Sequence, residues 1–233
     1  MSLRINADLT APVRTRGGEL PWIDSPAAGV QRRMLFRIGD EQARATSIVR
    51  YAPGSRFARH THTGGEEFIV LEGTFQDETG DFPAGTYVRN PPGTSHAPAS
   101  AEGCTILVKL WQFRCDDDVR TVVRPGEGAA LELAPGVDAA RLLFEGAGER
   151  VTVEDWRPDA AFNLNSQDGL ELFVLEGSFN DGQESLDRWC WLRLPPGQIL
   201  PVRVGAQGAR VWMKRGPVLH DDVCRFDNGA APQ

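Results

Sequence analysis

Two histidines and a glutamate in one short stretch have the spacing of a metal site. His60 and His62 are separated by one residue, and Glu66 follows four residues later. Alternate residues of a β-strand point to the same side, so both imidazoles are expected to enter one cavity. The Gly64-Gly65 pair predicts a turn, and the apolar run 68–71 predicts a returning strand that brings the glutamate beside the rings. Two imidazoles and a carboxylate are typical ligands of a transition metal.

A third imidazole lies in a second stretch, residues 85–96. A turn built on Pro91-Pro92-Gly93 leads there to His96, which is expected to begin another strand. The chain has four histidines, and the remaining one, His220, is expected to be a solvated surface residue. The joint spacing favours one metal, held by three nitrogens and one oxygen, over a polar hydrogen-bonded cluster. The expected ligands are His60, His62, Glu66 and His96.

Both stretches match the motifs of a known superfamily. The pattern G-x5-H-x-H-x3-E-x6-G is met by residues 54–73, and the pattern G-x5-P-x-G-x2-H-x3-N by residues 85–100, except that Ser100 replaces the final Asn. These motifs resemble those of the cupin superfamily, and residues 64–98 are most similar to the ChrR-like cupins, whose type member is an anti-sigma factor. The resemblance implies a β-barrel whose metal site is formed by the four ligands named above.

The carboxylate ligand and the metal each have alternatives. Glu67 is the second candidate for the carboxylate, because only one residue of an adjacent pair on a strand points inward, and the motif spacing favours Glu66. Four protein ligands in a tetrahedral array suit zinc. In an octahedral array the same ligands leave two open positions, as iron(II), manganese or nickel prefer. We expect one divalent transition metal, with zinc or iron(II) ahead of manganese or nickel.

The second half of the chain repeats the first. Residues 172–182 (LFVLEGSFNDG) correspond to residues 68–80 (FIVLEGTFQDETG), and residues 192–202 correspond to residues 88–99. Short strand-like runs between glycine- and proline-containing turns, with no sustained helical period, indicate an all-β protein. Together with the resemblance, the repeat predicts two tandem cupin barrels of the double-stranded β-helix (jelly-roll) type, a bicupin.

We expect residues 1–118 to form a metal-binding ChrR-like cupin barrel with an N-terminal arm, and residues 119–233 to form a degenerate second barrel. The linker is expected near residues 116–118 or around residues 124–126. In the alignment of the two halves, the residues opposite His60, His62, Glu66 and His96 are Asn163, Asn165, Leu170 and Leu200. Because amide oxygens are weak ligands and leucines are none, we expect no transition metal in the second barrel. Its role would be structural, or the binding of a small apolar ligand.

Composition limits the classes of partner. The net charge of −7 and the pI of about 5.2 argue against direct binding of nucleic acid. No apolar stretch has the length of a signal-peptide core or of a membrane span, so a cytoplasmic protein without membrane contact is expected. The cysteines show no CxxC spacing and are expected to be free thiols. They are Cys104, Cys115, Cys190 and Cys224.

Some side chains near the motif strands are candidates for contact with a substrate. Four arginines are expected to be strand-surface charge, with contact to an anionic substrate as the alternative: Arg50, Arg56, Arg59 and Arg89. Trp111 and Phe113 alternate on the strand after the second motif. They are expected in the core, with a place in the metal pocket as the alternative.

Two classes of function remain open. In the first, the protein is a metal-dependent enzyme, oxygenase- or lyase-like, that acts on a small organic molecule, and Glu66 leaves the metal to act as the catalytic base. The alternative, implied by the ChrR resemblance, is a regulatory or stress-sensing metal cupin that acts through a protein partner.

A sigma factor is not expected as that partner. The anti-sigma factors of the ChrR-like family carry a helical sigma-binding domain, with its own His/Cys zinc site, ahead of the cupin. In this chain no histidine precedes His60 and no cysteine precedes Cys104. The resemblance also implies a homodimer that pairs through edge strands.

Overall fold

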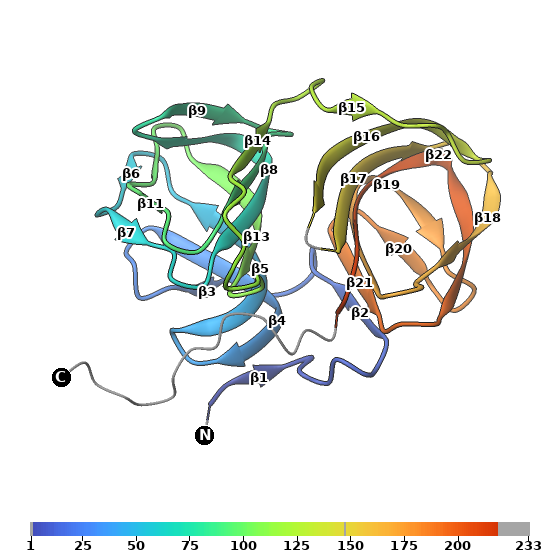
Figure 1. Ribbon diagram of the computed structural model, residues 1–233, viewed down its shortest axis with the longest axis horizontal. Helices are drawn as coiled ribbons and strands as arrows, with labels where there is room; N and C mark the ends of the chain where they lie inside the picture. Colours follow the sequence, from blue (N-terminus) through green and yellow to red (C-terminus); the bar gives the residue numbers. More distant parts are fainter. Residues whose placement is uncertain (1, 147, 219–233) are drawn as a thin grey trace. The chain divides into compact units, whose positions relative to one another are not determined.

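A computed structural model describes residues 2–146 and 148–218 of the chain (Figure 1). These residues form strands and turns but no helix, so the predicted all-β class is confirmed. The described part of the chain accordingly has no helix that could span a membrane. It divides into two compact units, one of residues 2–7 and 22–125 and the other of residues 8–21, 126–146 and 148–218. Each unit is a barrel of antiparallel strands.

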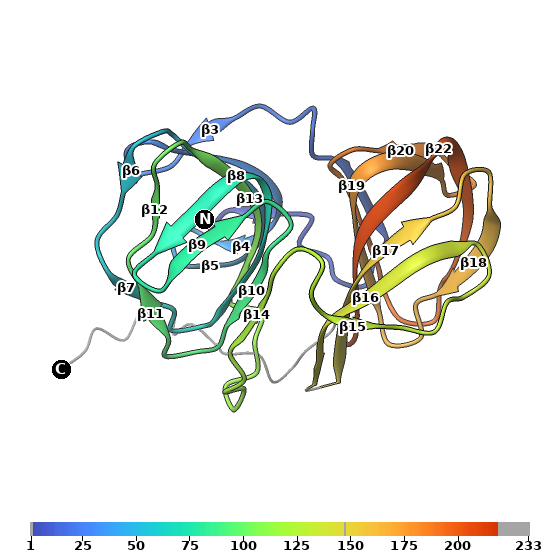
Figure 2. The ribbon, with the colours of Figure 1, turned by 90° about the horizontal axis from the view of Figure 1, so that it is seen from above.

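The first barrel is built on a sheet with the strand order β1-β4-β5-β13-β8-β10-β14. Off this path, β3 pairs with β4, β9 with β8, and β12 with both β6 and β8, while β7 pairs with β11. In Figure 2 these strands curl around one interior. They are β1 (Arg4–Ile5), β3 (Ile23–Asp24), β4 (Val30–Gly39), β5 (Ala43–Tyr51), β6 (Ser55–Arg56), β7 (His60–Thr61), β8 (Glu66–Asp77), β9 (Gly80–Pro83), β10 (Tyr87–Asn90), β11 (Ser95–His96), β12 (Ala99–Ser100), β13 (Cys104–Leu110) and β14 (Thr121–Val123).

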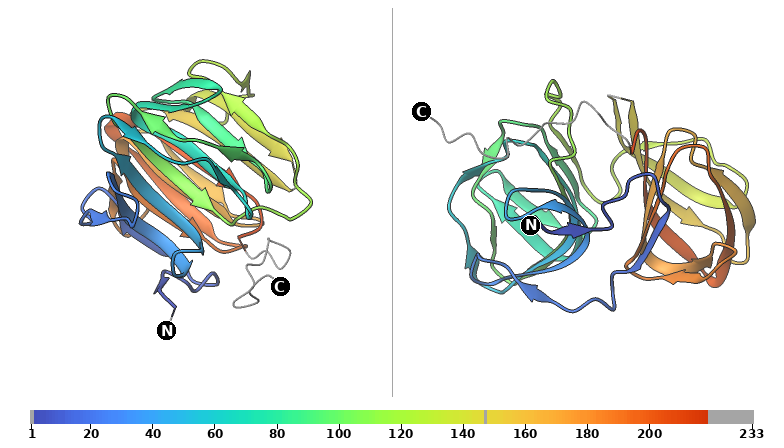
Figure 3. Two further views of the ribbon diagram at one scale, coloured as in Figure 1. Left: turned by 90° about the vertical axis from the view of Figure 1, so that its left-hand side faces the viewer. Right: turned by 90° about the horizontal axis from the view of Figure 1, so that it is seen from below.

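The second barrel repeats this arrangement with the strand order β15-β16-β17-β22-β19-β21-β2. Strand β18 pairs with β22, and β20 pairs with β19. Figure 3 shows how strongly the long strands of each barrel curve. The strands of the second barrel are β2 (Val13–Arg16), β15 (Ala129–Ala130), β16 (Val137–Gly146), β17 (Glu149–Trp156), β18 (Ala161–Asn165), β19 (Leu170–Asn180), β20 (Ser185–Asp187), β21 (Cys190–Leu194) and β22 (Ile199–Arg215).

The interior of each barrel is apolar, because alternate residues of the long strands point inward. Phe68 and Val70 of β8 belong to the buried cluster of the first barrel, whereas Ile69 between them is buried on the other face of the sheet. Leu170 and Leu172 of β19 take part in the corresponding cluster of the second barrel. Burial of these side chains is the main source of stability in both units.

The division between the units differs from the expected boundary after residue 118. Strand β14 pairs with β10 of the first barrel, so the first unit extends to residue 125, close to the second of the two expected linker positions. Residues 8–21 of the expected N-terminal arm belong to the second unit. Strand β2 pairs there with β21, and Arg14 forms an ion pair with the buried carboxylate of Asp181.

The cysteines that the structure describes are free thiols, as the sequence predicts. Cys104 and Cys190 are buried, and Cys115 is exposed. Cys224 lies outside the described residues, and so does the fourth histidine, His220.

Candidate metal centre

Three imidazole rings meet at the end of the first barrel where β8 begins and β13 ends. Strand β7 pairs with β11 in a register that sets His60 opposite His96, and His62 follows directly after β7. The ring centroids are 4.5 Å apart for His62 and His96 and 5.1 Å apart for each of the other two pairs. One nitrogen from each ring lies within 4.8 Å of the other two, close enough for all three to bind one ion.

A carboxylate stands beside these rings. Glu66 is the first residue of β8, and its Oε2 lies 3.3 Å from His62 Nε2 and 3.6 Å from His96 Nε2. Asn90, its register partner on β10, donates a hydrogen bond of 3.3 Å from Nδ2 to the same oxygen. The structure therefore brings together all four residues that the sequence singled out.

Glu67 points to the other face of the sheet. Its side chain is buried there, and its Oε1 accepts a hydrogen bond of 2.6 Å from the hydroxyl of Tyr87. The alternation of the strand separates this adjacent pair and leaves Glu66 as the carboxylate beside the histidines.

Burial disfavours charge on the enclosed members of the cluster. Burial, and then the neighbouring rings of His96 and His60, lower the pKa of His62 to about 3. The pKa of His96 falls to about 4, chiefly through burial and then through His60. Burial raises the pKa of Glu66 to about 7, against the lowering effect of the hydrogen bond from Asn90. At neutral pH both enclosed rings are neutral, which is the form that binds metals, so this donor set fits a divalent cation.

A second carboxylate lies at the far side of His96. Asp77, the last residue of β8, has a buried side chain, and its Oδ2 lies 3.5 Å from His96 Nδ1. Its Oδ1 accepts hydrogen bonds of 2.6 Å from both the backbone nitrogen and the hydroxyl of Thr79. His96 Nδ1 is buried and makes no hydrogen bond among the described residues, so Asp77 meets it at 3.5 Å without one. A carboxylate at this nitrogen orients the ring so that Nε2 faces the other histidines, a role that the sequence analysis did not foresee.

Replacing Asp77 with asparagine is expected to weaken metal binding by about tenfold to a hundredfold. The amide keeps an oxygen for Thr79 but sets an NH₂ group against His96 Nδ1, which then lacks an acceptor for its proton. Competition with a chromophoric chelator measures the affinity. Asp81→Asn is the matched control, because Asp81 lies on the neighbouring β9 and accepts a hydrogen bond from Gln76 instead. Equal losses in the two variants would contradict the role given to Asp77.

The cluster adjoins a cavity of about 520 Å³ in the first barrel. His60, His62 and Glu66 contribute to its lining, and much of the remaining wall is apolar. Trp111, one of the two aromatic residues singled out from the sequence, lines this cavity. Phe113, the other, is buried with the guanidinium of Arg89 lying 4.2 Å from its ring centroid. A partly apolar cavity with a few convergent polar groups is the usual form of a small-molecule site.

The second barrel has leucines at the corresponding positions. Its register pairs Leu164 with Leu200 where the first barrel pairs His60 with His96. Strand β19 begins with Leu170, where β8 begins with a glutamate. All three leucines belong to the buried apolar cluster of this barrel. We therefore keep the expectation that this barrel binds no transition metal.

The structure corrects one part of the alignment between the two halves. The sequence alignment sets Asn163 and Asn165 opposite the first two histidines, but both asparagines are exposed. Leu164 takes the place of His60 in the strand register. Ser166 takes the place of His62, because the backbone groups of these two residues make equivalent hydrogen bonds in the turn that follows each of them. The shift is one residue, and it moves the polar side chains from the interior to the surface.

Solved structures identify the class of fold. A putative dioxygenase from Nostoc punctiforme has a TM-score of 0.67 at 14 % identity, over 99 % of this chain and 87 % of that chain. The pirin YhhW from Escherichia coli, in complex with nickel(II), has a TM-score of 0.64 at 13 % identity, over 89 % and 100 %. Oxalate decarboxylase from Lactobacillus farciminis, in a formate complex, has a TM-score of 0.63 at 10 % identity, over 89 % and 87 %. The chain is therefore a protein of the cupin fold with two jelly-roll barrels.

A family model matches part of the chain. Residues 10–114 match the model of the family described as the ChrR cupin-like domain, in agreement with the motifs found in the sequence. Among curated proteins, none matches the chain.

Proposed function

We propose that the chain is a metal-dependent enzyme, oxygenase- or lyase-like, that acts on a small organic molecule in the first barrel. The observation that carries this proposal is the convergence of three ring nitrogens and a carboxylate beside a cavity of about 520 Å³. Structural metal sites are closed by protein ligands and need no adjoining cavity, whereas catalytic sites keep open positions for a substrate. Similarity to a putative dioxygenase and to an oxalate decarboxylase supports an enzyme.

The metal ligands we propose are His60, His62, His96 and Glu66, around one divalent ion. A transition metal held there supplies a Lewis acid and open coordination positions for a substrate. Iron(II) and zinc are the first candidates, and manganese and nickel are the next. The nickel(II) of the similar pirin structure supports a transition metal in this fold.

Glu66 is also the residue we propose as the catalytic base. It lines the cavity, and burial raises its pKa to about 7 in the metal-free chain. A Glu66 side chain that is not bound to the metal would therefore accept a proton, and return it, near neutral pH. The hydrogen bond from Asn90 orients the carboxylate of Glu66 so that its Oε2 faces the histidines. The apolar wall of the cavity limits water around the bound substrate.

A regulatory or stress-sensing role through a protein partner is the second candidate, favoured by the match to the ChrR cupin-like domain. In that role the cluster would respond to its ligand and transmit the change to a partner other than a sigma factor. The cavity beside the ligands favours the enzyme.

Metal analysis followed by a substrate screen tests the proposal. We expect about one ion per chain in protein purified anaerobically from cells supplied with iron and zinc. Iron-loaded protein should consume at least one substrate from a panel of diketones and aromatic acids, measured both as oxygen uptake and as substrate loss under argon. The metal-free protein is the control, and the zinc-loaded protein is screened in parallel for substrate loss that needs no oxygen. No turnover by fully loaded protein across the panel, together with capture of a specific protein partner, would favour the regulatory role.

A further inference from the structure

Two arginines line the same cavity as the candidate metal site. Arg32 and Arg37 lie on β4, and both contribute to the wall of the 520 Å³ cavity together with Glu66. The cavity therefore has a cationic side in addition to its metal-binding side. Neither arginine was among those weighed from the sequence for contact with an anion.

Arg37 is a buried cation whose charge is not balanced by an ion pair among the described residues. Its side chain is buried, with 3 % of the residue exposed. Its Nε donates to Gly39 O at 3.1 Å and its Nη2 to Glu41 O at 3.5 Å. Both acceptors are backbone carbonyls, so Arg37 has no ion-pair partner in the described part of the chain. A buried guanidinium without a carboxylate is costly, and an anionic ligand would offset that cost.

Arg32 adds a second donor beside it. Its Nη2 donates to Glu41 Oε1 at 3.1 Å, but the side chain of Glu41 is 67 % exposed, so this ion pair is weak. Its Nε is buried and has no hydrogen-bond partner among the described residues. Among the described residues, the ion pair of Arg32 with the solvated Glu41 is thus the one ion pair that these two guanidinium groups make. Burial, and next the charge of Arg32, lower the pKa of Arg37, and the charges of Glu41 and Asp40 oppose this shift without reversing it. The direction agrees with two cations held close together.

The strand register sets this cationic side across from the metal ligands. Glu66 pairs with Leu110, Leu110 pairs with Ala45, and Ala45 pairs with Arg37, in one row across β8, β13, β5 and β4. Three inter-strand spacings of about 4.8 Å give roughly 14 Å along the sheet, and less across its curved interior. The floor between the two sides is apolar, because the row passes over leucine and alanine.

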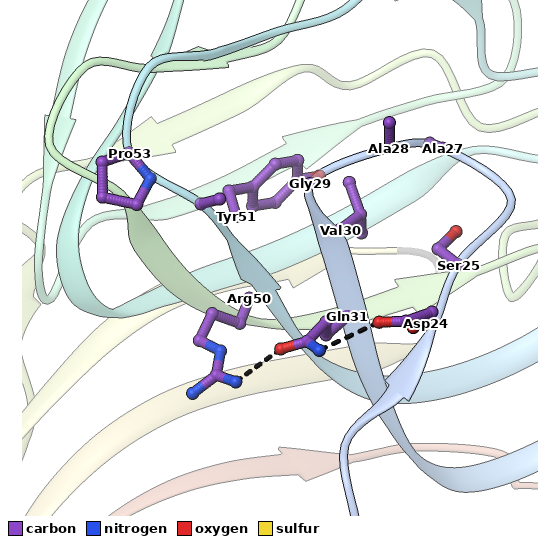
Figure 4. Close-up of a pocket in the computed structure, with 11 residues that line it drawn as sticks. Asp24, Ser25, Ala27, Ala28, Gly29, Val30, Gln31, Arg50, Tyr51 and Pro53 are labelled. Atoms are coloured by element: carbon purple, nitrogen blue, oxygen red, sulfur yellow. Dashed lines mark hydrogen bonds between the residues drawn. The ribbon is translucent and has the colours of Figure 1, made fainter.

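None of the four arginines singled out from the sequence lines the metal cavity, and two of them, Arg50 and Arg89, are engaged elsewhere. In Figure 4, Arg50 donates to Gln31, which in turn donates to Asp24, in a chain along a neighbouring cleft of about 790 Å³. Arg89 forms a buried ion pair with Asp117. Neither lines the metal cavity, so Arg32 and Arg37 are the cations that a bound molecule would meet.

We propose that the molecule bound in this cavity is a small organic carboxylate, whose carboxylate group pairs with Arg32 and Arg37 while its other end faces the histidines. The inference rests on the proposed function for the identity of the site, and it names the substrate class. Two carboxylate oxygens match the two guanidinium groups, and charge-assisted bonds to arginine are strong. The apolar floor accommodates a short hydrocarbon body.

Calorimetry on the zinc-loaded full chain tests this, because zinc has no redox chemistry and therefore cannot oxidise the bound probe. The probes are butyrate, hexanoate and benzoate, each paired with its primary amide, together with inorganic phosphate and phenyl phosphate. We expect at least one carboxylate to bind about tenfold or more tightly than its amide. A carboxylate can also bind the metal directly, so the decisive quantity is this ratio in arginine variants.

Arg37→Gln and Arg32→Gln should each lower the carboxylate-to-amide ratio, and the double variant should remove it. Arg37→Lys keeps the positive charge and should therefore retain part of the carboxylate-to-amide ratio. Arg33→Gln is the matched control, because Arg33 lies next to Arg32 on β4, outside the cavity lining, with its guanidinium 4.3 Å from the ring of Trp22. Its ratio should equal that of the wild type.

Zinc content, measured on the same samples, separates this inference from the proposed function. If the double variant loses the preference for the carboxylate over its amide while its zinc content stays unchanged, the result supports both the inference and the proposed metal centre. Protein that binds no zinc but loses its carboxylate preference in the double variant supports the arginines and contradicts the metal centre. The inference is overturned if amides bind as tightly as carboxylates, if the double variant keeps the preference, or if the phosphates bind more tightly than every carboxylate.

Discussion

Replacing His62 with alanine is expected to reduce the metal content of the purified chain from about one ion to nearly none. His62 is the ring closest to the rest of the cluster, with its Nε2 3.2 Å from His96 Nε2 and 3.3 Å from Glu66 Oε2. Its loss removes one of three nitrogens and leaves a gap in a buried site. If four ligands share a binding free energy of about 12 kcal/mol, one ligand accounts for about 3 kcal/mol, or a hundredfold or more in affinity. Elemental analysis after dialysis against a weak chelator measures the loss.

The second barrel supplies a matched control for this variant. Ser166 occupies the position of His62, is fully buried, and donates from Oγ to Pro195 O at 2.7 Å. Ser166→Ala therefore disturbs an equivalent turn, at a cost of about 1–3 kcal/mol in stability, without touching a proposed ligand. Its metal content should stay at the wild-type value. Metal retained by His62→Ala would show that the ion binds elsewhere. Equal loss in Ser166→Ala would show that disturbance of the fold, and not removal of a ligand, releases the metal.

The histidine cluster was predictable because its geometry is local. His60 and His62 stand two residues apart, a turn follows, and the next strand begins at Glu66, so the period of the strand and one hairpin suffice. His96 was found by its motif, and the pairing of β7 with β11 gives the physical reason for it. Alternation also decided correctly that Glu66 and Glu67 face opposite ways.

The residues that the sequence analysis missed lie on strands that contain β-bulges. Arg32 and Arg37 are five positions apart, which on a regular strand would place them on opposite faces. The register between β4 and β5 shifts between Met34 and Phe36, and this extra residue turns both arginines toward the cavity. The pairing of β8 with β13 shifts in the same way, between Val70 and Glu72, ahead of Asp77. The position of a bulge depends on the partner strand, so the sequence of one strand does not give it.

The alignment of the second barrel with the first was wrong by one residue for a different reason. Polar residues were matched to polar residues, and the alternation of side chains along the strand was not used. Asn163 and Asn165 look like replacements for histidines, yet Leu164 is the residue that points inward. The buried leucine at the start of β19 would have indicated the correct shift. The first unit extends to residue 125 because β14 pairs with β10. This pairing is non-local, so the sequence around residue 118 does not indicate it.

Replacing Gly73 with alanine is expected to destabilise the first barrel by about 3–5 kcal/mol. This residue closes the first motif and has φ +69°, where a side chain costs about 1–2 kcal/mol. A Cβ there would also lie 2.2 Å from the carbonyl oxygen of Gly103, which is backbone and cannot move aside. In the second barrel Gly177 has the same φ, and its Cβ would lie 2.0 Å from Gly208 O. Because the copy keeps this glycine where the metal ligands are replaced, its role is in the fold rather than in the metal site.

Scanning calorimetry of the full chain measures the effect, and Gly54→Ala is the control. Gly54 opens the same motif with φ +76°, but a Cβ there would meet nothing within 4 Å. Gly54→Ala should therefore cost only the conformational strain, about 1–2 kcal/mol. Equal destabilisation by the two variants would mean that φ alone requires glycine at both positions. A much larger loss in Gly73→Ala would show that the contact between two backbone segments requires it, since Gly103 O can approach β8 this closely only where residue 73 has no side chain.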